Sequence, residues 1–209
     1  MTTPDYLPRI FQANIDRLFQ RVILPGLHAL PVHAELCAEE ASSMNDLLMK
    51  AEAQVDNYTA SEGAKAYTLV LAGLFERQLR IWARSSSAPL REEASKEKFR
   101  KLVTDCAREF DVDLEHRRVG RTLVEMFLVA NVFRHGDGPS VANLREQSPE
   151  LWIYEQSRYV DHLPPNGDES EKLLLEPDDV VRYATACSRF WGLADKFDGA
   201  LVDPPYDQA

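Results

Sequence analysis

The chain has 209 residues, of which 44% are hydrophobic and 9% aromatic, so it can bury a sizeable core and is not disordered throughout. The 34 acidic residues outnumber the 24 basic ones, and a net charge of -10 excludes a protein that coats DNA through overall positive charge. Three widely spaced cysteines without a CxxC pair disfavour a zinc ribbon or a disulfide framework. The N-terminus carries Asp5 and lacks the apolar region of a signal peptide, and no apolar run approaches the length of a membrane span. We therefore expect a cytoplasmic protein without membrane contact.

Apolar residues recur at helical spacing through most of the chain, which predicts an all-α fold, a bundle of about six or seven helices. The periodicity fails between residues 151 and 176, where the turn at 164–168 makes a small β-hairpin within 152–175 an option. The expected helices cover roughly residues 5–24, 33–55, 61–84, 91–110, 114–135, 140–147 and 177–197.

Local signals predict where several helices begin and end. Pro25 and Gly26 are expected to end the first helix, and Ser61 suits the N-terminal turn of the third. Gly136 is expected to stop the fifth helix, and Ser140 to cap the short helix after it. The chain then divides into an N-terminal helical segment, a helical core, a hairpin or loop with the C-terminal helix, and a flexible acidic tail: residues 1–60, 61–150, 151–197 and 198–209.

Charge is distributed unevenly along the chain. From Arg77 to Arg145 there are 14 basic and 10 acidic residues, so this stretch carries +4 and the remainder -14. The densest basic group, Arg117, Arg118 and Arg121, predicts a site for an anionic ligand such as a phosphate. The alternative is a solvated helix face without a ligand.

A polar cluster follows at the end of the fifth expected helix. Asn131 and His135 are four residues apart and so share one helical face, and Arg134 is adjacent to His135. Asparagine can orient a ligand, histidine can transfer protons near neutral pH, and arginine can stabilise a phosphorane. These residue types suit metal-independent RNA cleavage by a 2′-hydroxyl. The alternative is that Arg134 and His135 only complement the helix dipole before Gly136.

The segment resembles the HEPN domain (higher eukaryotes and prokaryotes nucleotide-binding), whose signature reads Arg-polar-x-x-x-His, often with Asn after the Arg. Asn131 and His135 match the Asn and His, whereas Ala130 stands at the position of the signature arginine. An apolar helix with the pair Glu76-Arg77 precedes it, as is frequent in such bundles, and the resemblance covers roughly residues 61–151. It implies a dimeric helical bundle, of a kind that often acts as an RNase in bacterial toxin–antitoxin or antiviral systems.

Two functions follow from this resemblance. The first is an RNase that uses His135 as general acid or base, with Asn131 and a nearby arginine such as Arg134. The second is a non-catalytic subunit that binds, scaffolds or neutralises a toxin, which the missing arginine favours. The expected partners are RNA, a cognate antitoxin or defence-system protein, and a second copy of the chain. No cofactor is expected, and the spacing of His28 and His33 does not predict a metal site.

Overall fold

The computed structural model describes residues 6–33, 43–85, 98–153 and 167–208, and these residues form helices and no strand. This confirms the all-α prediction. Most of the expected hairpin, including residues 164–166 of its turn, falls in 154–166, outside the described residues. The elements are α1 (Leu7–Leu18), the π-helical turn η1 (Phe19–Ile23), α2 (Leu24–His28), α3 (Met44–Arg84), α5 (Phe99–Glu109), η2 (His116–Arg118), α6 (Val119–His135), α7 (Pro139–Gln147), η3 (Pro149–Trp152), α9 (Pro177–Ala194) and η4 (Pro205–Gln208).

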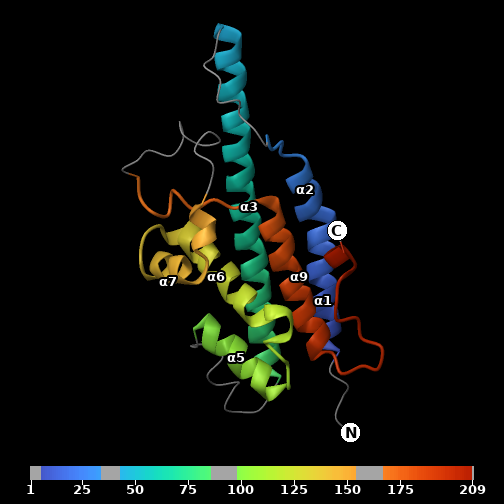
Figure 1. Cartoon of the computed structure of the whole chain (residues 1–209). Coiled ribbons are helices and arrows are strands. Elements are labelled where there is room, and N and C mark those ends of the chain that lie inside the picture. Colours follow the sequence, from blue (N-terminus) through green and yellow to red (C-terminus); the bar gives the residue numbers. More distant parts are fainter. Residues whose placement is uncertain (1–5, 34–42, 86–97, 154–166, 209) are drawn as a thin grey trace.

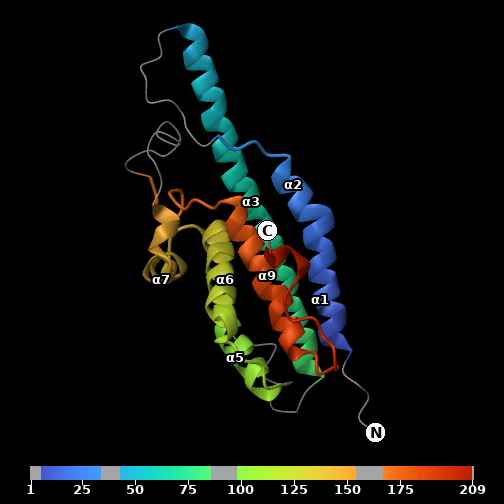
Figure 2. The same cartoon turned by 45° about the vertical axis from the view of Figure 1, so that its right-hand side comes forward.

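Helix α3 is the long helix against which other helices of the bundle pack (Figure 1). Helices α6 and α9 pack along it, and α1 packs on α9, so that α6, α9 and α1 lie side by side in Figure 2. The core where these helices meet is aromatic: Trp82, Phe190 and Trp191 are fully buried, with centroids of the Trp82 and Trp191 rings 5.2 Å apart. Leu123 and Trp82 are core residues as predicted.

The N-terminal end of α3 projects beyond the other helices (Figures 1 and 2). The prediction of two helices, 33–55 and 61–84, is wrong, because α3 is one helix of 41 residues. Ser61 does not cap a helix; its hydroxyl accepts the backbone N–H of Leu175 at 3.0 Å, a contact distant in sequence. The N-cap is instead Ser43, whose side chain accepts the N–H of Asp46.

The first helix continues past Pro25, contrary to the prediction. The π-helical turn at η1 widens the backbone just before the proline, which accommodates a residue that has no N–H and would otherwise clash with the preceding turn. Gly26 then lies against α3 so closely that a Cβ there would be 1.9 Å from the hydroxyl of Tyr67. This glycine serves the close approach of two helices rather than a helix end.

The boundaries around α6 and α7 agree in part with the prediction. Gly136 stops α6 with a φ of 70°. Helix α7 begins at Pro139 with Gly138 as its N-cap, so Ser140 is not the cap. Residues 91–97 of the fourth expected helix lie outside the described part, and α5 begins at Phe99. Among the described residues, no helix is long and apolar enough to cross a membrane.

Candidate functional site: an arginine-lined pocket between α6 and α9

A cavity of about 530 Å³ lies between α6 and α9. Its walls carry the three arginines singled out by the sequence and two more from α9. Arg121 comes from α6, and Arg117 and Arg118 come from the turn before it. The arginines that line the cavity are Arg117, Arg118, Arg121, Arg182 and Arg189.

The backbone before α6 bends sharply at two of these arginines. Arg117 and Arg118 both have left-handed conformations, with φ of 46° and 58°. This region costs a non-glycine residue of the order of 1 kcal/mol, and such strain is concentrated at functional sites. The bend joins η2 to α6 and brings both side chains to the rim of the pocket, where they are exposed.

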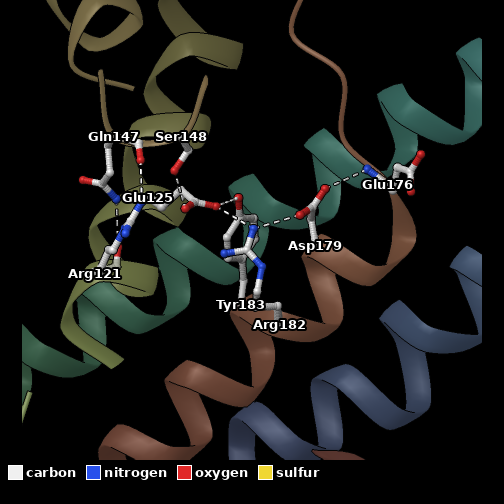
Figure 3. A network of polar contacts seen from close by, with 8 residues as sticks. All are labelled: Arg121, Glu125, Gln147, Ser148, Glu176, Asp179, Arg182 and Tyr183. Carbon is white, nitrogen blue, oxygen red and sulfur yellow. Dashed lines mark hydrogen bonds and ion pairs between the residues drawn. The ribbon is translucent and has the colours of Figure 1, made fainter. Parts of the chain in front are cut away.

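One wall of the pocket is built on the buried carboxylate of Glu125, which ties α6 to α9 and to the end of α7 (Figure 3). The Ser148 hydroxyl and the Tyr183 hydroxyl donate to it at 2.6 and 2.8 Å. The Arg182 guanidinium donates at 2.6 Å and also reaches Asp179 at 2.8 Å. The network therefore fixes the position of Arg182 in the pocket.

Ionisation of this network follows from its geometry. Burial raises the pKa of Glu125, but hydrogen bonds from Arg182, Ser148 and Tyr183 outweigh it, and the pKa lies below its ordinary value. Burial raises the pKa of the Tyr183 hydroxyl, which therefore stays a neutral donor to the carboxylate. Glu125 and Arg182 thus form a charged pair at neutral pH.

Two of the guanidinium groups that line the pocket, those of Arg118 and Arg121, are not paired with a carboxylate in the part of the chain that the structure describes. Arg121 donates from Nη2 to the carbonyl of Gln147 at 2.6 Å, and Gln147 donates back to the Arg121 carbonyl at 3.0 Å (Figure 3). The guanidinium group of Arg118 makes no hydrogen bond or ion pair within the described residues. Among the described residues, the lining carboxylates Glu150 and Asp178 make no ion pair with Arg118 or Arg121. The guanidinium group of Arg118 and the remaining donors of Arg121 are thus available for a phosphate or carboxylate ligand.

A second cavity, of about 730 Å³, shares Arg121 with the first. One wall is apolar and includes Phe99 and Phe127, whose rings stack with centroids 4.0 Å apart. Phe127 is half-buried rather than a full core residue as predicted. The rest of the polar lining consists of two further cations, three amides and one carboxylate: Lys98, Arg100, Asn131, Asn143, Gln147 and Glu146.

The structure separates the two predicted groups of site residues. Asn131 is half-buried in the second cavity, one helical turn before His135. His135 and Arg134 are exposed at the end of α6 and line neither cavity. The rise of an α-helix places His135 about 21 Å along the axis from Arg121. The predicted catalytic histidine and the arginine cluster therefore do not meet in one pocket of a single chain.

The segment directly after His135 has a structural role. The carboxylate of Asp137 accepts the backbone N–H groups of Glu169 and Ser170 at 3.2 and 2.7 Å. Hydrogen bonds from Ser170 lower the pKa of Asp137. The Gly-Asp-Gly turn thus holds the chain that leads into α9.

Sequence reasoning missed the contribution of α9 to the pocket. Val181, Arg182, Thr185, Ala186 and Arg189 all line it, and their spacing of one, three, one and three residues places them on a single helical face. Two arginines seven residues apart on an otherwise apolar helix were the available signal. Glu125, in the middle of an apolar helix, was a second one.

Comparison of the chain with protein-family models, with curated proteins and with solved structures finds no match. The function is therefore inferred from the geometry of the site and from the resemblance of the sequence to the HEPN domain.

Proposed function

We propose that the protein is a HEPN-like helical bundle that binds RNA, with the arginine-lined pocket as the phosphate-binding part of the site. The observation that carries this proposal is the convergence of Arg117, Arg118 and Arg121 with Arg182 and Arg189 on one cavity. Guanidinium groups bind phosphate oxygens through paired hydrogen bonds. In a chain of net charge -10, such a cluster is a local exception to the overall charge.

The adjoining cavity supports RNA over an isolated phosphate. It offers apolar contact at Phe127 and hydrogen-bonding amides at Asn131 and Asn143, the groups that bind an unstacked base. Arg121 lines both cavities, so a phosphate in the first and a base in the second would belong to neighbouring parts of one strand.

The direct test is a titration of labelled single-stranded RNA with the full chain. Arg118→Gln removes one charge from the pocket at nearly constant length, and we expect affinity to fall about tenfold at low salt. Arg21→Gln is the matched control, because Arg21 is exposed on η1, in the N-terminal helical region of the chain. An equal loss in the two variants would contradict the proposal.

Cleavage of the bound RNA is the second candidate function, and the specific observation in its favour is the placement of Asn131 and His135 one turn apart on α6. The proposed reaction needs no metal. The 2′-hydroxyl loses its proton and attacks the phosphate, the P–O5′ bond breaks, and the leaving O5′ takes up a proton, with His135 as the proton-transfer group; the products carry a 2′,3′-cyclic phosphate end and a 5′-hydroxyl end. His135→Ala should then lower cleavage about 10²–10⁴-fold while RNA binding is retained. Cleavage that EDTA abolishes, or full cleavage by His135→Ala, would refute it in favour of binding alone.

The resemblance to the HEPN domain also implies that two copies of the chain assemble. We propose a homodimer with the Asn131–His135 face of α6 near the two-fold axis, acting in the cytoplasm with RNA and with an antitoxin or defence-system protein. Light scattering that gives a strict monomer at tens of micromolar would contradict the dimer.

A further inference from the structure

The C-terminal segment after α9 packs back onto the bundle, although the sequence predicts a flexible tail. The Leu201 carbonyl accepts from Gln12 Nε2 at 2.7 Å, which joins the segment to α1. The Tyr206 hydroxyl donates to Asp16 at 2.6 Å, and its ring packs on Phe19 with centroids 4.5 Å apart. These contacts fix the course of residues 201–206.

Helix α9 is shaped to receive this segment. A Cβ at Gly192 would lie 2.5 Å from the Leu201 carbonyl oxygen and 2.8 Å from the Val202 Cα. Both are backbone atoms and cannot move aside as a flexible side chain could. Glycine at this position of a helix lowers helical stability, so its presence is explained by the close approach of the segment.

The segment delivers a carboxylate to the rim of the arginine-lined pocket. Asp203 accepts from Arg189 Nε at 2.7 Å and lies 3.4 Å from Arg117 Nη2. The hydrogen bond from Arg189 lowers the pKa of Asp203, which is therefore ionised at neutral pH. Tyr206 of the same segment lines the pocket itself.

We propose that Asp203 is a built-in competitor of the RNA phosphate: its carboxylate is ion-paired with both Arg117 and Arg189 in the free protein, and a phosphate must displace it. This inference depends on the proposed RNA-binding function and adds its regulation. A carboxylate and a phosphate present the same kind of oxygen acceptor to a guanidinium group. Whether Asp203 or an RNA phosphate occupies Arg117 and Arg189 therefore depends on the relative affinities of the carboxylate and the phosphate for these arginines.

The geometry makes this exchange feasible. The ion pair of Asp203 with Arg117 is weak, because the two side chains are 40% and 54% exposed and water screens their attraction. The pair with Arg189 is screened less, because the Arg189 side chain is 7% exposed, so a phosphate is expected to displace Asp203 from Arg117 first. The anchors at Gln12, Asp16 and Gly192 do not involve the arginines. They keep the carboxylate near the pocket at a high effective concentration even when its ion pairs are broken.

The test compares Asp203→Asn with Asp198→Asn in the full chain, using the same labelled RNA. Both variants remove one negative charge from the C-terminal segment, but Asp198 is exposed and makes no ion pair within the described residues. We expect Asp203→Asn to tighten binding about two- to fivefold, the range for breaking a partly exposed ion pair, and Asp198→Asn to leave it nearly unchanged. Circular dichroism melts of both variants check that the fold is intact.

The outcomes separate the two proposals. Unchanged or weaker binding by a folded Asp203→Asn overturns the competitor role, and equal tightening by the two variants overturns it as well, since the effect would then be one of net charge. In both cases the loss of affinity in Arg118→Gln still supports the RNA site. If neither the wild type nor Asp203→Asn binds RNA, both proposals fail.

Discussion

Replacing Glu125 with glutamine keeps the size of the side chain but removes the charge that three donors share. The carboxylate is 2% exposed and receives hydrogen bonds from Ser148, Arg182 and Tyr183. In the variant only one of the two side-chain atoms can accept a hydrogen bond, so the NH2 group of the glutamine must face at least one of these donors. The hydroxyls of Ser148 and Tyr183 can rotate to accept, whereas Arg182 can only donate.

The magnitude follows from these contacts. Hydrogen bonds to a charged group contribute about 1.5–3 kcal/mol each, and removing one partner of a buried pair costs about 3–5 kcal/mol. Because glutamine keeps one acceptor, we expect Glu125→Gln to lower the free energy of unfolding by about 2–3 kcal/mol. For a chain of this size that corresponds to a drop in Tm of about 4–12 °C. Urea denaturation at neutral pH measures it, with exposed Glu52→Gln as a control expected within about 0.5 kcal/mol.

The pH dependence gives an independent check. The pKa of Glu125 is lowered in the folded chain, so its ionised form stabilises the fold above the ordinary glutamate pKa of about 4.3, and this contribution is lost as pH falls through the folded pKa. The stability difference between wild type and Glu125→Gln should therefore shrink on acidification. A difference that stays constant down to about pH 3, or a Tm of Glu125→Gln equal to that of wild type, would refute this reasoning.

Three further outcomes are expected from the packing. Gly192→Ala should lower the free energy of unfolding by about 1–3 kcal/mol, because its Cβ would collide with the Leu201 backbone. The same variant should expose the C-terminal segment to limited proteolysis, and a segment that stays resistant to the protease would contradict this. Phe127→Ala should cost about 2–3 kcal/mol, at the lower end for an aromatic residue, because the ring is half-buried on Phe99; an unchanged Tm would argue against that contact. Cys106 should react with a thiol reagent at pH 8 only on unfolding, since burial raises its pKa to about 12; rapid labelling of the native protein would contradict its burial.

The sequence was informative where local chemistry decides the outcome. Helical periodicity predicted the buried faces of α6 and α9, and Gly136 marked the end of α6 because its positive φ favours glycine. The cluster Arg117, Arg118 and Arg121 was found by charge density alone, and the structure places all three on one cavity.

Features set by contacts distant in sequence were not predictable. Ser61 is a residue type that often begins a helix. Its hydroxyl instead accepts the backbone N–H of Leu175, and α3 continues through this position without a break. Gly26 and Gly192 are explained only by the chain segments that pack against them. The separation of His135 from the arginines follows from their positions along α6, yet no local pattern indicates which side of the helix forms a pocket.

The salt dependence of RNA affinity tests the central claim most directly. Each phosphate contact releases bound counterions, so the slope of log K against log salt counts the contacts that form. The account predicts that Arg118→Gln lowers the magnitude of this slope by about one, whereas Arg21→Gln leaves the wild-type slope unchanged. Equal slopes for the wild type and Arg118→Gln would contradict binding of RNA phosphates in the arginine-lined pocket.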